Sequence, residues 1–165
     1  MTRKQFTREE DVAYLRRAIE VSRHAREHGN TPFGAILVGP QGEVLIEQEN
    51  IEVTTGHCTG HAETTCIDRA SQVYSKAFLA DCSLYTTAEP CAMCSGALYW
   101  AGVGRVVYAM TERQLLSMTG ANEQNPTFDL PCRYVFSRGQ KPIEVVGPFD
   151  DIAPEAAAVH EGYWG

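Results

Sequence analysis

A chain of 165 residues is typical of one domain and is long enough to bury a substantial core. Its hydrophobic fraction of 44% and charged fraction of 21% are those of an ordinary globular protein, and no apolar run approaches the length of a membrane span. The net charge of −7, with no Lys or Arg near the C-terminus, argues against a nucleic-acid partner, because proteins that bind RNA phosphates normally carry a basic patch or tail.

The N-terminal residues and the cysteines favour a cytoplasmic protein. Met1-Thr2-Arg3-Lys4-Gln5 leads into charged residues and not into an apolar signal-peptide segment. The six cysteines are therefore expected to be thiols and not disulfides. Cys66 and Cys82 fall within apolar patterns and are predicted core residues, whereas Cys58 and Cys132 have no predicted role.

Hydrophobic periodicity, helix caps and turn residues divide the chain into alternating helices and strands. In the first helix, for example, Thr7 and Glu10 form a capping box and Gly29-Asn30 supplies a stop. In chain order we expect a helix at about 8–28, strands at 35–38 and 44–46, a loop at 51–60, a helix at 61–73, a strand at 82–87, a helix at 90–101, strands at 105–109 and 143–146 with a further helix between them, and a last helix at 154–164.

This order of elements predicts an α/β fold. Residues 1–165 are expected to form a single domain, a three-layer α/β/α sandwich around a central mixed five-stranded sheet. Residues 120–131 are rich in Asn and Pro and are expected to form an ordered loop, and residues 150–165 are expected to form a C-terminal tail.

Two short segments bring together the residue types of a catalytic zinc site. His61-Ala62-Glu63 supplies an imidazole and a carboxylate, and Pro90-Cys91-Ala92-Met93-Cys94 supplies two thiols three residues apart, a spacing that shares one helix face. Zinc binds thiolate and imidazole, and three protein ligands leave a fourth position for water, whose pKa the metal lowers towards neutrality. We therefore predict that His61, Cys91 and Cys94 bind Zn²⁺ and that Glu63 passes protons beside the metal.

A closed structural zinc site is the alternative interpretation of these motifs. Such a site needs a fourth ligand, which His57 or Cys58 could supply. It would leave Glu63 without a purpose, and the sequence offers no second pair of ligands.

The order H-x-E then P-C-x-x-C resembles the signature of the zinc deaminases, and at these residues the chain is similar to the cytidine deaminase superfamily. The resemblance implies the α/β/α fold and a hydrolytic deamination, in which Glu63 takes a proton from water and delivers protons to a ring nitrogen and the leaving amine. It also implies substrate-binding roles for Phe33, Asn50 and Ala62.

Further runs resemble the guanine deaminase branch, over about residues 10–110. They are Pro32-Phe33-Gly34-Ala35, Tyr85-Thr86 leading to Glu89-Pro90-Cys91, and Ala97-Leu98-Tyr99-Trp100-Ala101. The resemblance implies that Trp100 packs against a purine and that Asp129 contacts the ring nitrogens, although the loop that holds Asp129 is longer here than in that branch. It also implies that the tail crosses to a partner subunit and places Tyr163 over the partner's site.

The sequence thus predicts a zinc-dependent deaminase of a small nucleobase, most simply guanine to xanthine and ammonia, that forms a homodimer through its swapped tail. Nucleoside, cytosine and aminotriazine deaminases are alternative interpretations. A tRNA adenosine deaminase shares both motifs, but the acidic tail argues against an RNA substrate. A non-enzymatic, zinc-stabilised interaction domain is the alternative from another class.

Overall fold

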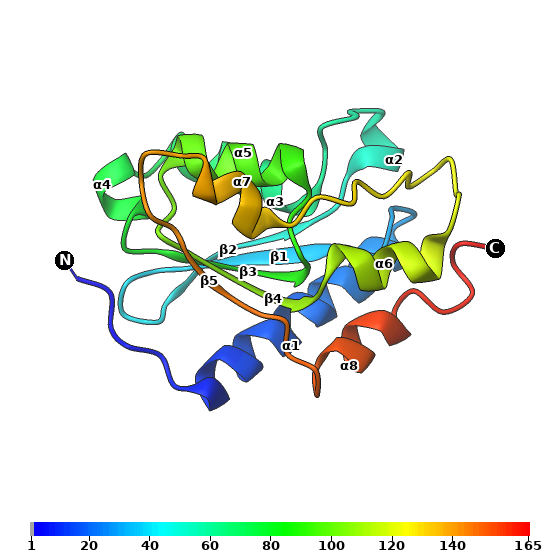
Figure 1. The fold of residues 1–165 in the computed structure, drawn as a ribbon, viewed down its shortest axis with the longest axis horizontal. Coiled ribbons are helices and arrows are strands. Elements are labelled where there is room, and N and C mark those ends of the chain that lie inside the picture. The colour runs from blue at the N-terminus through cyan, green and yellow to red at the C-terminus, as the bar shows by residue number, and fades with distance from the viewer. Residues whose placement is uncertain (1) are drawn as a thin grey trace.

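The centre of the molecule is one mixed sheet, in a computed structural model that describes residues 2–165 (Figure 1). Its strands lie in the order β2-β1-β3-β4-β5, with β1 antiparallel to both β2 and β3, and with β3, β4 and β5 parallel to one another. The strands are β1 (Gly34–Val38), β2 (Val44–Glu49), β3 (Ser83–Ala88), β4 (Arg105–Met110) and β5 (Glu144–Val146). The predicted mixed five-stranded sheet is confirmed.

Helices cover both faces of the sheet, which confirms the three-layer prediction. α1 and α8 lie on one face, and α3, α5 and α7 lie on the other (Figure 1). The helices are α1 (Arg8–Glu27), α2 (Glu52–Thr55), α3 (Ala62–Ser71), α4 (Lys76–Leu79), α5 (Ala92–Ala101), α6 (Glu112–Thr119), α7 (Cys132–Ser137) and α8 (Ala153–Ala158).

The strand β1 is apolar on both faces because it separates two hydrophobic cores. Successive side chains of a strand point to opposite faces, so Ile36 and Val38 of β1 join the core beneath α1, whereas Ala35 and Leu37 join the core beneath α3 and α5. A strand buried on both sides reads as a continuous apolar run. The five residues of β1, GAILV, are all buried.

Gly34 lets α1 approach the start of β1 closely. A Cβ atom at this position would lie 2.5 Å from the backbone nitrogen of Ser22 and 2.6 Å from the carbonyl oxygen of Ala18. Only glycine avoids this clash, which involves backbone atoms that cannot move aside. The residue before it, Phe33, is thereby held at the edge of the sheet.

Element boundaries differ from the prediction mainly near irregular segments. The predicted loop at 51–60 contains one helical turn, α2, and the last helix ends at Ala158 instead of continuing to residue 164. Beyond α8 the chain turns, and Gly162 adopts a φ of 70°, which is incompatible with a continuing right-handed helix. The predicted loop at 120–131 has no helix or strand, as expected.

No helix within residues 2–165 combines the length and the apolar character needed to cross a membrane.

Candidate active site

The site lies at one edge of the sheet because of the strand directions. β3 and β4 are parallel, so their carboxyl ends lie side by side, with Ala88 paired to Met110. β1 runs in the opposite direction, and its first residue, Gly34, pairs with Glu49 at the end of β2. The segments that enter or leave these four strands therefore meet at the same edge, the place where open α/β sheets bind ligands.

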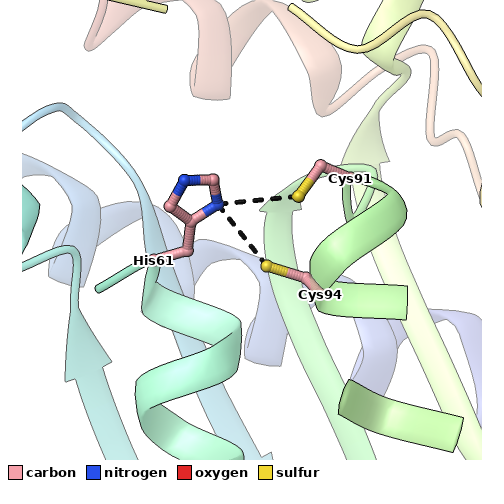
Figure 2. A group of neighbouring side chains, drawn as sticks. All are labelled: His61, Cys91 and Cys94. Carbon is pink, nitrogen blue, oxygen red and sulfur yellow. Dashed lines mark hydrogen bonds between the residues drawn. The ribbon is translucent and has the colours of Figure 1, made fainter. Parts of the chain in front are cut away.

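Three predicted metal ligands meet at this edge. Nδ1 of His61 lies 3.6 Å from Sγ of Cys91 and 3.5 Å from Sγ of Cys94 (Figure 2). The three ligand atoms all lie within 4.8 Å of one another, and they are the one such His/Cys/Asp/Glu cluster among the residues that the structure describes. The structure thus brings together the two motifs, which are about 30 residues apart in the chain.

The spacing of these atoms fits zinc. Zinc bonds of about 2.3 Å to sulfur and about 2.0–2.1 Å to nitrogen, at tetrahedral angles, put the sulfur and nitrogen atoms about 3.6 Å apart. The two nitrogen–sulfur distances match this value. One imidazole and two thiolates form a donor set with three protein ligands, which leaves the open fourth position of a catalytic zinc site.

Two helix N-termini supply the ligands. His61 is the N-cap residue of α3 and Cys91 is the N-cap residue of α5, and neither side chain caps its own helix. Their side chains are therefore free to face the metal position. The positive end of a helix dipole favours thiolate over thiol. Hydrogen bonding from the Cys94 thiol, with a further contribution from His61, lowers the pKa of Cys91 to about 4.

Glu63 is placed to handle protons beside this cluster. It lies in the first turn of α3, is 7% exposed and lines the cavity in front of the metal ligands. Burial, reinforced by the negative charge of Cys91, raises the pKa of Glu63 to about 7. A carboxyl group with a pKa near the operating pH can both accept and donate a proton, as general acid–base catalysis requires.

A second carboxylate, Glu52, holds the far side of His61. Its Oε2 lies 3.5 Å from Nε2 of the ring whose Nδ1 faces the two thiols. A carboxylate at this position fixes the orientation of a metal-binding imidazole. Glu52 carries no local sequence signal, because it lies in a segment predicted to be loop.

The cavity is small, acidic and partly apolar. Its volume is about 300 Å³, at the low end of the range for small-molecule sites. No Lys or Arg is found among the described residues that line it. The lining residues are Thr31, Phe33, Asn50, Glu52, His61, Glu63, Ala88, Glu89, Cys91, Met93, Glu112, Leu115 and residues 124–128.

Glu89 anchors both ends of the segment that covers the cavity. Its Oε1 accepts a hydrogen bond from the backbone nitrogen of Glu112 at 3.0 Å, and its Oε2 accepts one from that of Cys132 at 2.8 Å. These two residues begin α6 and α7, which flank the loop at 120–131. Glu89 is therefore structural here, with both carboxylate oxygens occupied.

Of the predicted substrate-binding residues, Phe33 and Asn50 line the cavity. Ala62 is fully buried and is not part of the cavity wall. Asn50 holds the start of α2, because its Oδ1 accepts a hydrogen bond from the backbone nitrogen of Glu52 at 2.9 Å. No hydrogen bond from its Nδ2 is found among the described residues, so this donor is available to a ligand.

Trp100 lies outside the cavity of this chain. It is 73% exposed, and it is six residues beyond Cys94 on α5. At about 100° and 1.5 Å per residue, this spacing puts it about 120° around the helix and about 9 Å along the axis from the metal ligand. Trp100 is therefore not placed to contact a base bound in the cavity of its own chain.

Asp129 also points away from the cavity. Its Oδ2 lies 3.0 Å from Nη2 of Arg113, an exposed ion pair at the surface. Its neighbours Thr127 and Phe128 line the cavity, but Asp129 does not. The loop at 120–131 does line the cavity, but through residues 124–128 and not through Asp129.

The C-terminal tail packs against its own chain, next to the cavity. The indole Nε1 of Trp164 donates a hydrogen bond to Nδ1 of His160 at 3.0 Å, and both rings contact Phe33. The carbonyl oxygen of Trp164 accepts a hydrogen bond from Asn122 at 2.9 Å. The tail thus supports both the Phe33 wall and the covering loop; Tyr163 itself does not line the cavity. Its crossing to a partner subunit stays a prediction.

Deleting residues 162–165 is expected to lower kcat/KM about tenfold without unfolding the domain. The deletion removes the Trp164 contacts that hold Phe33 and the loop at 120–131, at a cost of about 1 kcal/mol for each lost hydrogen bond. Deleting Gly165 alone is the matched control. Steady-state kinetics and thermal unfolding of both variants check this, and normal kinetics in the longer deletion would remove the tail from the site.

His160 is expected to make the fold sensitive to mild acid. Burial lowers the pKa of His160 to about 4 from its ordinary 6.5, so between these values the unfolded chain binds a proton that the folded chain does not. Stability is full above about pH 6.5 and falls by on the order of 3 kcal/mol as the pH drops towards 4. Urea unfolding of His160→Asn should show a shallower fall than the wild type, whereas exposed His57→Asn should not. An unchanged slope in His160→Asn would contradict the assignment.

A cluster of three zinc-type ligands in an α/β/α sandwich, with a buried carboxyl group beside it, defines the class of this protein as a zinc-dependent enzyme domain. The family model for the cytidine and deoxycytidylate deaminase zinc-binding region matches residues 8–110. The chain therefore belongs to the cytidine and deoxycytidylate deaminase family.

Individual relatives within this family carry different substrate names. The chain is 39% identical over 156 residues to a probable cytosine deaminase of Schizosaccharomyces pombe, covering 94% of this chain and 93% of that protein. It is 41% identical over 97 residues to the guanine deaminase of Bacillus subtilis, covering 58% and 62%. A solved structure of Bacillus subtilis guanine deaminase matches at a TM-score of 0.62 and 29% identity, covering 96% of this chain and 97% of that chain.

Proposed function

We propose that this protein is a zinc-dependent hydrolytic deaminase of a free nucleobase. The observation that carries the proposal is the three-ligand cluster of His61, Cys91 and Cys94 at the wall of a small cavity that also holds the buried Glu63. Zinc held by these ligands supplies Lewis acidity and lowers the pKa of a water molecule. The alternative of a closed structural site lacks its fourth ligand, since His57 and Cys58 are not part of the cluster.

In the proposed reaction Glu63 moves the protons. Its carboxylate takes a proton from the attacking water, the water oxygen bonds to the amino-bearing ring carbon, and Glu63 delivers the proton to the adjacent ring nitrogen. A second transfer through Glu63 protonates the amine, the carbon–nitrogen bond breaks, and ammonia leaves. Cytosine plus water gives uracil plus ammonia, and guanine plus water gives xanthine plus ammonia. Phe33 offers an apolar wall against which a planar base can pack.

The charge of the cavity favours a neutral base over a phosphate-bearing substrate. Glu52, Glu63, Glu89 and Glu112 line it, and no cationic side chain among the described residues does. A phosphate group or an RNA backbone would find no Lys or Arg partner here. This supports a free base over a nucleotide or a tRNA loop.

Cytosine is our first candidate for the base. The probable cytosine deaminase is similar to this chain over nearly the whole length of both proteins, whereas the match to guanine deaminase at higher identity covers only 58% of this chain. Trp100, on which a purine-binding role was expected, lies outside the cavity. Guanine is the second candidate, supported by the guanine deaminase structure that matches along almost the full chain.

An ammonia-release screen of the zinc-loaded protein tests this proposal. The panel is cytosine, guanine, adenine, guanosine, cytidine and an aminotriazine, at equal concentrations. We expect the highest kcat/KM with cytosine. Highest activity with guanine would exchange the two candidates, and the absence of ammonia from every free base would reject the proposed function.

A further inference from the structure

Glu112 is a buried carboxyl group in the cavity for which the proposed chemistry has no use. It is the first residue of α6, is 6% exposed and lines the cavity. It is not one of the site residues predicted from sequence, and the proposed proton transfers need only Glu63. A buried acidic group that lines a binding cavity and takes no part in the proposed proton transfers requires its own explanation.

The backbone of Glu112 is fixed at the cavity edge. Thr111 and Gln114 form a capping box at the start of α6, with hydrogen bonds of 2.7 Å and 3.0 Å. The backbone nitrogen of Glu112 donates to Glu89, as described above. The side chain is therefore carried by a rigid helix start, which is a suitable platform for a binding residue.

The side chain of Glu112 has no partner among the described residues. The hydrogen bond at this residue comes from its backbone nitrogen, and no hydrogen bond or ion pair of its carboxyl group is found within residues 2–165. Burial, together with the negative charges of Cys91, Glu63 and Glu89, raises the pKa of Glu112 to about 8. A carboxyl group that lines the cavity without a protein partner is available to hydrogen-bond a ligand.

The other carboxyl groups of the cavity wall are already engaged. Glu52 faces His61, both oxygens of Glu89 accept backbone hydrogen bonds, and Glu63 serves the reacting amidine. A free aminopyrimidine presents its amine and adjacent ring nitrogen to the catalytic pair, and its carbonyl oxygen needs a donor such as Nδ2 of Asn50. One polar group of the free aminopyrimidine is left, the N–H of the ring nitrogen to which the sugar is attached in a nucleoside. It is a donor, and Glu112 is the acceptor that remains.

We propose that Glu112 is a substrate-binding residue whose carboxyl group accepts a hydrogen bond from the ring N–H of the free base, and that it thereby selects bases over nucleosides. This inference rests on the proposed function and names its specificity element. A site built to hydrogen-bond a substrate N–H discriminates strongly against an analogue that lacks it, because the buried group is then left unpaired.

The test compares each base with its methylated analogue, in which the ring N–H is replaced by N–CH₃. The pairs are cytosine with 1-methylcytosine and guanine with 9-methylguanine. Wild-type protein is expected to prefer the unmethylated base at least a hundredfold in kcat/KM. Glu112→Leu is expected to lose ten- to a hundredfold on the free base and little on the methylated one, so that the preference shrinks at least tenfold.

Two further variants separate recognition from structural effects. Glu112→Gln keeps the size and an acceptor oxygen, and should fall between wild type and Glu112→Leu. Glu123→Gln makes the same type of substitution at an exposed position in the adjacent loop and should leave the preference unchanged. Zinc content and the thermal unfolding midpoint of each variant show whether the site and the fold are intact.

The same preference in folded, zinc-loaded Glu112→Leu as in the wild type would overturn this inference, because the discrimination would then come from the size of the methyl group. That outcome leaves the proposed function standing, since it requires active wild-type protein. Failure of the proposed function is a separate result, namely no ammonia from any base with wild-type protein. Equilibrium binding of uracil, measured by calorimetry, gives a second readout: Glu112→Leu should weaken it about tenfold or more.

Discussion

Replacing Glu63 with Gln is expected to abolish nearly all turnover while leaving the metal bound. Gln is similar in size to Glu but cannot take or deliver a proton, and proton transfer by a positioned side chain contributes on the order of 10²–10⁴-fold. Glu63 handles more than one transfer in the proposed reaction, so the loss should reach the upper end of that range. Because Glu63 is not one of the three clustered ligands, zinc content should not change.

The measurement is kcat for ammonia release with the best free base, together with zinc content by elemental analysis. Asp68→Asn is the matched control, because it changes an exposed acid on the same helix, α3, and should keep full activity. Activity of Glu63→Gln equal to that of the control would contradict the proton-transfer role. Loss of zinc together with activity would instead make Glu63 a part of the metal site.

Cys94→Ser is expected to lose both the metal and the activity. The thiolate is one of three ligands, and Cys94 is fully buried between α3 and α5, where the metal joins two helix starts. At a free zinc concentration about 1,000-fold above the dissociation constant, zinc binding stabilises the fold by about 4 kcal/mol. For a domain of this size that corresponds to a shift in Tm on the order of 10 °C.

Thermal unfolding with and without a chelator checks this prediction. The Tm of the wild type should fall on chelation towards that of Cys94→Ser, and the variant should not respond to the chelator. Cys58→Ser is the control, since Cys58 is exposed and outside the cluster, and it should retain one zinc per chain. A Cys94→Ser protein that keeps stoichiometric zinc would exclude Cys94 as a ligand.

The metal site could be predicted from sequence because its parts are local. The ligands lie in two short motifs, and the spacing of Cys91 and Cys94 already implies a shared helix face. The strands were predictable for a similar reason, since apolar runs such as Ala35-Ile36-Leu37-Val38 are bounded by turn residues. In both cases neighbouring residues carry the whole signal.

The rest of the cavity depends on long-range topology, which no local pattern contains. Glu52, Glu89 and Glu112 follow three different strands and meet only because β1 is reversed relative to β3 and β4. A signal for Glu112 did exist: the sequence Thr111-Glu112-Arg113-Gln114 is a capping box directly after a buried strand. It places an acidic residue at the carboxyl end of a strand, where α/β sheets bind ligands.

Trp100 shows that a local resemblance in sequence can also suggest a contact that the structure of this chain does not make. The run around it resembles guanine deaminases, but a resemblance in sequence does not determine where the side chain points. Its place on α5, well around the helix from Cys94, leaves it 73% exposed on the surface of this chain. The identity of the base therefore has to come from the residues of the cavity wall and from assay.

The most direct test of the central claim compares a free base with larger substrates that carry the same base. Ammonia release by the zinc-loaded protein would be measured with cytosine, cytidine, cytidine monophosphate and a tRNA anticodon stem-loop, and in parallel with guanine and its nucleoside. The absence of Lys and Arg from the described cavity wall disfavours phosphate-bearing substrates, and the proposed hydrogen bond from the ring N–H to Glu112 disfavours nucleosides. Together they predict that kcat/KM is at least a hundredfold higher for a free base than for any nucleoside, nucleotide or RNA. Preference for the nucleotide or the RNA stem-loop would contradict the account.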